Sequence, residues 1–130
     1  INRINNEGLD KVLPTLSNRW FTDIFIRNNK NIINKRLKQV QETPIKVFLN
    51  VFQIYALTEM GPWLNQITIP SLVMTGQNDI GCNPKINKKI AMTLKNTQLE
   101  ILSDLKHAIT LEAPKLVGSK IKKFLNGLKN

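Results

Sequence analysis

The spacing of apolar residues changes character about halfway along the chain. Up to residue 62 they recur every three or four positions, as in amphipathic helices. This spacing predicts helices over 30–41 and 45–56, and a helical N-terminal stretch that Pro14 should break. A further short helix is expected after Thr22, which is a possible N-terminal cap. The first half of the chain is therefore predicted to be helical.

Two short apolar runs in the second half, 71–75 and 98–102, have the length of buried strands. A helical pattern lies between them, and Pro84 suits its first position after the possible cap Asn83. Its apolar face consists of Ile86, Ile90, Ala91 and Leu94. Because a helical crossover joins parallel strands, the predicted fold class is α/β with two parallel strands. A last helix is expected over 114–128, packed against the sheet and capped by Glu112 or Thr110.

One acid and one histidine follow these two strands. Asp79 comes four residues after the first strand, and His107, the single histidine, comes five residues after the second. The carboxyl ends of neighbouring parallel strands open onto one edge of the sheet, where ligands bind. We therefore expect the two side chains to meet. A carboxylate that accepts a proton from Nδ1 leaves Nε2 of the imidazole able to act as a base.

These residues resemble the C-terminal part of the α/β-hydrolase family. The similar motifs are an acid turn, Gly76-Gln77-Asn78-Asp79, and a histidine loop in which His107 precedes Glu112-Ala113-Pro114. Within the family, the sequence around these motifs is most similar to that of esterases and lactonases of the 3-oxoadipate enol-lactonase type. The resemblance implies that residues 63–130 form the C-terminal portion of the core and that residues 1–62 form a helical cap or lid.

The nucleophile motif of that family, Gly-x-Ser-x-Gly, does not occur in these 130 residues. None of the serines has the flanking glycines that the motif requires: Ser17, Ser71, Ser103 and Ser119. The chain begins with Ile1 rather than Met, so we expect it to be the C-terminal part of a longer hydrolase. Its serine would lie upstream, and this chain alone would be inactive.

Each catalytic candidate also has a structural interpretation. A lone aspartate in such a turn is usually a turn former, and a lone histidine is usually a packed or surface residue. Their joint placement after two parallel strands favours the acid and base roles. Asp104 is a rival acid, but it lies on the loop of the histidine itself. Cys82, the single cysteine, is expected to be a packing residue, since it has no base placed for it.

Six aromatic and apolar residues are candidates for lining an apolar substrate pocket, although for any single one of them packing between cap helices is the favoured interpretation: Trp20, Phe21, Phe52, Tyr55, Met60 and Trp63. The resemblance implies a small ester or lactone as substrate, and it implies no metal or organic cofactor. The alternative is a folded module without enzymatic activity. In either case an exposed edge of the two-stranded sheet could pair with another chain.

The net charge of +10 raises the possibility of nucleic-acid binding. The basic residues are spread over both halves, however, and lysine outnumbers arginine, which is typical of solvated helix faces. We therefore expect no nucleic-acid partner. The apolar runs are far shorter than the roughly 20 residues that cross a bilayer, so no membrane association is expected. A single cysteine excludes an internal disulfide and favours a cytoplasmic location.

Overall fold

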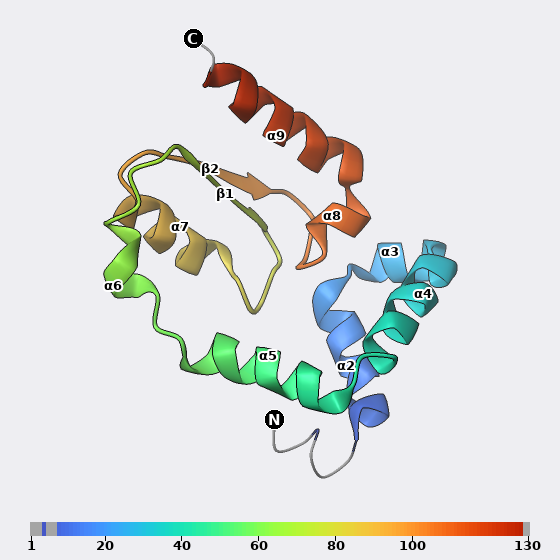
Figure 1. The fold of residues 1–130 in the computed structure, drawn as a ribbon. Coiled ribbons are helices and arrows are strands. Elements are labelled where there is room, and N and C mark those ends of the chain that lie inside the picture. Colours follow the sequence, from blue (N-terminus) through green and yellow to red (C-terminus); the bar gives the residue numbers. More distant parts are fainter. Residues whose placement is uncertain (1–3, 5–7, 129–130) are drawn as a thin grey trace. The chain divides into compact units, whose positions relative to one another are not determined.

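The computed structural model describes residue 4 and residues 8–128, and the chain divides into two compact units (Figure 1). The first unit comprises Ile1–Asn18 and Asp23–Glu59. The second comprises Arg19–Thr22 and Met60–Asn130, so a short segment of the helical half belongs with the strands. This assignment matters for the site, because Arg19–Thr22 lies in the same unit as both catalytic candidates.

The helices of the first half are α2 (Leu9–Trp20), α3 (Asp23–Asn28), α4 (Lys30–Gln41) and α5 (Ile45–Leu57). The bounds of α4 agree with the predicted helix, and α5 is one residue longer than predicted. The buried apolar side chains of the first unit lie mainly on α2 and α4: Leu9, Val12, Leu13, Ile33 and Val40. Helical spacing of apolar residues therefore predicted these helices correctly.

The predicted break at Pro14 is wrong, because α2 continues through this residue to Trp20. A proline inside a helix removes one hydrogen bond and costs about 3 kcal/mol. Pro14 itself is exposed, whereas Leu9, Val12 and Leu13 are buried. Each fully buried side chain of this kind contributes about 1.5–3 kcal/mol, so together they outweigh the cost of the proline.

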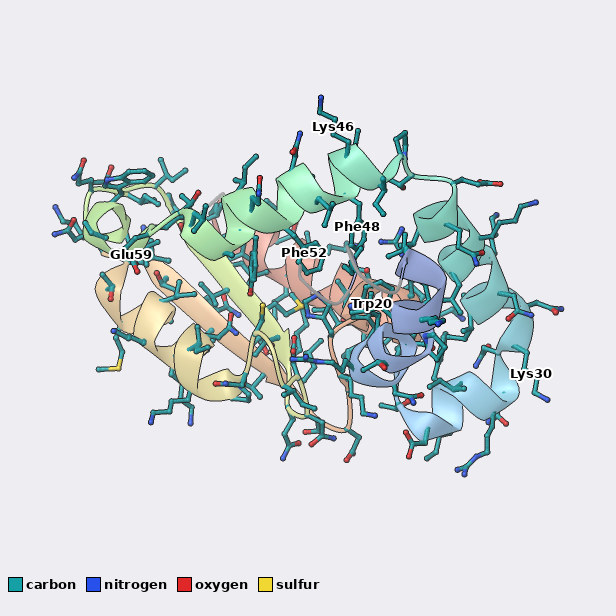
Figure 2. All side chains as sticks on the ribbon, turned by 90° about the horizontal axis from the view of Figure 1, so that it is seen from below. Trp20, Lys30, Lys46, Phe48, Phe52 and Glu59 are labelled. Atoms are coloured by element: carbon teal, nitrogen blue, oxygen red, sulfur yellow. The ribbon has the colours of Figure 1, made fainter. Side chains whose placement is uncertain are left out.

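Helix α5 is apolar in sequence, yet none of its residues is buried among the residues that the structure describes. Phe48 and Phe52 stack on one another, with ring centroids 4.8 Å apart. They lie on one side of the helix, and Lys46 extends from the opposite side (Figure 2). The stack uses the i, i+4 spacing that places two side chains on the same helix face.

The second unit contains α6 (Gly61–Leu64), β1 (Ser71–Gly76), α7 (Pro84–Thr93), β2 (Thr97–Leu102), α8 (Ile109–Glu112) and α9 (Pro114–Gly127). The two strands are parallel and pair from Ser71 opposite Thr97 to Gly76 opposite Leu102. Helix α7 packs against both strands, and α9 lies on the opposite side of the strand pair (Figure 1). The predicted parallel strands and crossover helix are therefore confirmed.

The N-terminus of α7 is capped as predicted, because Asn83 Oδ1 accepts a hydrogen bond of 3.1 Å from the backbone N–H of Ile86. The predicted apolar face of α7 is only partly correct. Ile86 is 47% exposed, and the buried residue of this helix is Asn87. Its Nδ2 donates to the carbonyl oxygens of Cys82 and Asn83. Burial of Asn87 is possible because these bonds satisfy its amide.

An ion pair links β2 to α9. Lys120 Nζ lies 2.7 Å from Glu100 Oε2, and the carboxylate also accepts a hydrogen bond from Gln98. The bond from Lys120, with the bond from Gln98, holds the pKa of Glu100 below its ordinary value of 4.5. A lowered pKa in the folded state stabilises the protein above the ordinary value, and this contribution is lost as the pH falls through the folded pKa.

We therefore expect Lys120→Met to lower the free energy of unfolding by about 1 kcal/mol at pH 7 and by less at pH 3, where Glu100 is closer to its folded pKa. Urea unfolding at the two pH values measures both effects. Lys122→Met is the matched control, since Lys122 is an exposed lysine of the same helix, and it should change stability equally little at both pH values. A Lys120→Met loss of equal size at pH 3 and pH 7 would contradict the role of the ion pair.

No helix among residues 8–128 is both long enough and apolar enough to cross a membrane.

Candidate functional site

The turn that follows β1 holds the carboxylate of Asp79 in a fixed orientation. Asp79 Oδ1 accepts hydrogen bonds from the backbone N–H groups of Gly81 (2.9 Å) and Cys82 (3.0 Å). The backbone N–H of Asp79 donates to the carbonyl oxygen of Gly76, which closes the turn. The side chain of Asp79 is only 5% exposed. Because Oδ1 is bound by the turn itself, Oδ2 is the carboxylate oxygen that can bind another residue.

The loop that follows β2 is joined to this turn by backbone hydrogen bonds. The N–H of Gln77 donates to the carbonyl of Leu102, and the N–H of Asn78 donates to that of Leu105, both at 2.8 Å. Asp104 has φ of 58°, in the left-handed region that aspartate tolerates better than most residues. A Cβ at Gly76 would lie 2.5 Å from the Leu105 carbonyl oxygen and closer still to that of Lys106. Only glycine allows the two loops to approach so closely.

The two predicted site residues meet across these loops. Nδ1 of His107 lies 2.7 Å from Oδ2 of Asp79, the distance of a charge-assisted hydrogen bond. The imidazole is about half exposed, whereas the carboxylate is buried. Asp79 therefore fixes the ring and its tautomer, and Nε2 is the ring nitrogen that can accept a proton from a neighbouring group. The rival acid Asp104 is exposed and lies on the loop of the histidine.

The segment Arg19–Thr22 supports the histidine loop from a distant part of the sequence. The backbone N–H of Ala108 donates to the carbonyl of Trp20 at 2.8 Å. Glu112 accepts two hydrogen bonds from Thr22, one from its N–H (3.1 Å) and one from its hydroxyl (2.6 Å). The predicted capping of α9 by Glu112 or Thr110 is wrong, because the N-cap of α9 is Ala113 and has no side-chain hydrogen bond. Sequence patterns carry no signal for a contact between residues 90 positions apart.

Replacing Glu112 with glutamine should lower the free energy of unfolding by about 1–2 kcal/mol, because the carboxylate accepts two hydrogen bonds from Thr22 and an amide replaces one acceptor with a donor. Urea unfolding measures this loss. The control Glu42→Gln changes a carboxylate in an exposed pair with Lys38, 3.7 Å apart, which should contribute less than about 0.5 kcal/mol. Equal effects of the two substitutions would show that Glu112 does not hold the segment.

The serines lie in places that do not suit the nucleophile of a hydrolase. Ser17 is buried in α2 and Ser119 lies in α9, where its hydroxyl donates to the carbonyl of Leu116. Ser71 begins β1, and Ser103 lies in the exposed turn after β2. The described residues therefore bring together a carboxylate and an imidazole.

The candidate pocket residues differ widely in exposure. Phe21 is fully buried, which is typical of a packing residue. Tyr55 is 68% exposed, and Met60 and Trp63 are each 55% exposed. Trp20 and Phe52 are partly buried. The contribution of these side chains to a substrate pocket remains a prediction.

No model of a known protein family matches the chain. It is 24% identical over 111 residues to two curated proteins of Acinetobacter baylyi (strain ATCC 33305 / BD413 / ADP1), 3-oxoadipate enol-lactonase 1 and 3-oxoadipate enol-lactonase 2. Each alignment covers 85% of this chain and 41% of the relative. The chain thus spans less than half the length of the curated relatives it matches.

Solved structures match nearly the whole chain. The enol-lactonase from Burkholderia xenovorans LB400 matches with a TM-score of 0.91 at 18% identity, covering 96% of this chain and 48% of that protein. A thermophilic esterase from Thermogutta terrifontis matches with a TM-score of 0.85 at 21% identity, covering 99% and 48%. The chain therefore has the fold of the C-terminal part of an α/β-hydrolase, and the α/β-hydrolases are the family that its sequence and structure resemble.

Proposed function

We propose that this chain supplies the acid and the base of a serine hydrolase that cleaves a small ester or lactone. Asp79 would be the acid and His107 the base, and the serine would lie outside these 130 residues. The observation that carries the proposal is the 2.7 Å contact between Asp79 Oδ2 and His107 Nδ1 after two parallel strands. The enol-lactonase and esterase relatives support an ester or lactone as the substrate class.

In this reaction Nε2 of His107 accepts the proton of the serine hydroxyl as the oxygen attacks the carbonyl carbon. The imidazolium that forms is stabilised by the buried carboxylate of Asp79, which stays ionised. The imidazolium then gives its proton to the leaving oxygen of the ester or lactone. Water, activated by the same histidine, releases the acid from the acyl-serine. Every proton step uses a single nitrogen, Nε2.

We further propose that the helices of residues 1–62 act as a cap that excludes water from the reacting ester. The support is the exposure of apolar side chains on α5, which include Val47, Val51, Ile54 and Leu57. Exposed apolar side chains on a lid suit an apolar substrate better than a charged one. Residues 63–130 would form the C-terminal portion of the hydrolase core.

The test is to read the coding DNA upstream of Ile1 and to express the whole open reading frame. The expected result is an in-frame Gly-x-Ser-x-Gly motif after an apolar strand, and a product that hydrolyses p-nitrophenyl acetate and reacts covalently with a fluorophosphonate at that serine. The 130-residue chain should do neither. An open reading frame without this motif would contradict the proposal and favour the alternative, a folded interaction module without enzymatic activity.

Exposed apolar side chains and an open sheet edge favour this alternative. Helix α9 exposes Leu116, Ile121 and Leu125, and Leu128, which follows the helix, is also exposed. Within the described residues the strand pairing is that of β1 with β2, so a sheet edge is open to another strand. A non-enzymatic module would use these surfaces for pairing with a second copy or a partner, and a hydrolase would cover them with the rest of its own sheet.

A further inference from the structure

We propose that Asp79, Cys82 and His107 form a binding site for a thiophilic divalent cation such as Zn²⁺, and that binding of the cation blocks the proposed base. One potential ligand atom from each residue, a carboxylate oxygen, the thiol sulfur and a ring nitrogen, lies within 4.8 Å of the other two. Binding itself does not rest on the proposed hydrolase function, whereas the block of catalysis does.

The distances suit a zinc ion after small side-chain rotations. Zinc binds sulfur at about 2.3 Å and imidazole nitrogen or carboxylate oxygen at about 2.0–2.2 Å. Two ligands of one tetrahedral ion therefore lie about 3.5 Å apart. Oδ2 and Nδ1, now 2.7 Å apart, must separate slightly, and the sulfur must approach. The half-exposed imidazole can make this adjustment without moving the buried carboxylate.

The backbone around Cys82 is already held in place. Its carbonyl oxygen accepts hydrogen bonds of 2.7 Å from Thr75 Oγ1 and from Asn87 Nδ2. Its N–H donates to Asp79 Oδ1. Thr75, Asn87 and Asp79 are all buried. The backbone of Cys82 and the carboxylate of Asp79 are thus held relative to one another, as surrounding residues orient metal ligands, and a rotation of the Cys82 side chain brings its sulfur toward the cation.

The donor set selects the kind of cation. One sulfur, one imidazole nitrogen and one carboxylate oxygen suit Zn²⁺ or Co²⁺, whereas Mg²⁺ and Ca²⁺ require several oxygen ligands. Three protein ligands leave one position of a tetrahedral ion for water or a small anion. The site is therefore expected to discriminate strongly between Zn²⁺ and Mg²⁺.

Binding of the cation releases one proton from the thiol and moves another between the two ring nitrogens. The thiol loses its proton to solvent as its sulfur binds the cation. Nδ1 of the neutral imidazole donates its lone pair to the cation, and the ring proton moves from Nδ1 to Nε2. With a proton on Nε2, the histidine no longer has a lone pair to accept the proton of a serine. Occupation by the cation and action as a base therefore exclude one another.

The test uses the 130-residue chain with Co²⁺ as the spectroscopic probe and Zn²⁺ as the competitor. Because Cys82 is the single cysteine and His107 the single histidine, any thiolate-to-cobalt charge-transfer absorption must come from Cys82. We expect this absorption to appear with Co²⁺, to disappear on addition of equimolar Zn²⁺, and to persist in a large excess of Mg²⁺. In Cys82→Ser the charge-transfer absorption should be absent.

His107→Asn distinguishes the proposed site from cobalt bound by the thiol alone. It should weaken Co²⁺ binding more than about tenfold, since even changes outside the ligand shell cost 10- to 100-fold in metal affinity. Circular dichroism of each variant shows that the chain is folded. Absence of the charge-transfer absorption in the unchanged chain, or unchanged Co²⁺ affinity in a folded His107→Asn variant, would overturn the metal site. A failure to find an upstream serine would leave these two results unaffected.

Discussion

Replacing His107 with alanine is expected to lower the turnover of the proposed hydrolase by about 10⁴-fold or more. The substitution removes the nitrogen that accepts the serine proton. Asp79→Asn should also cost about 10⁴-fold, because the amide does not stabilise an imidazolium and can bind the wrong tautomer of the ring. Steady-state hydrolysis of p-nitrophenyl acetate by the product of the whole open reading frame measures both losses.

The matched control for Asp79→Asn is Asp104→Asn. Both substitutions remove one carboxylate at the same edge of the strand pair, and asparagine tolerates the left-handed backbone of Asp104. Turnover of Asp104→Asn should stay within about threefold of the unchanged enzyme, because the carboxylate bonded to His107 is that of Asp79. If Asp104→Asn lost as much turnover as Asp79→Asn, the assignment of the acid would be wrong.

Gly76→Ala is expected to lower the free energy of unfolding by about 3 kcal/mol or more. The new methyl group would meet the backbone carbonyls of Leu105 and Lys106, so the acid turn and the histidine loop would have to separate. Backbone atoms cannot rotate away as a side chain can, and the loops are also tied by the hydrogen bonds from Gln77 and Asn78. Urea unfolding of the 130-residue chain measures the loss.

Gly118→Ala is the control for this glycine substitution. Gly118 lies in α9, where an added Cβ would meet no atom within 4 Å. Because alanine is the better helix former, this substitution should stabilise the chain by about 0.5–1 kcal/mol. A Gly76→Ala variant as stable as Gly118→Ala would show that the two loops can move apart at little cost, and the 2.7 Å contact of the acid and the base would then need another support.

Some elements were predictable because their causes are local. The helix α4 follows from apolar residues at helical spacing, and the cap of α7 follows from Asn83 placed directly before Pro84. The meeting of Asp79 with His107 was predictable for a different reason. A crossover helix makes its two strands parallel, and parallel strands bring their following loops to one edge. The prediction therefore rested on a general rule of topology, because the sequence alone does not give the distance between the two side chains.

Other features depended on long-range packing. A proline inside a helix normally ends it, yet α2 continues through Pro14, because the burial of Leu9, Val12 and Leu13 outweighs the cost of the proline. Asn87 is buried in place of the apolar Ile86, because partners on the preceding loop satisfy its amide. In both cases the local preference exists, but a larger free-energy contribution from tertiary interactions outweighs it.

The sequence by itself determined the α/β class, the pair of parallel strands, and the acid and histidine that follow them, because periodicity, caps and strand order depend on neighbours along the chain. Only the tertiary structure decided which groups hold that pair in place: the close approach at Gly76, the contact of Glu112 with Thr22, and the position of Cys82 beside Asp79 and His107. Each of these features brings together segments that are far apart in the sequence. Their free energy depends on distances that exist only once the backbone has folded.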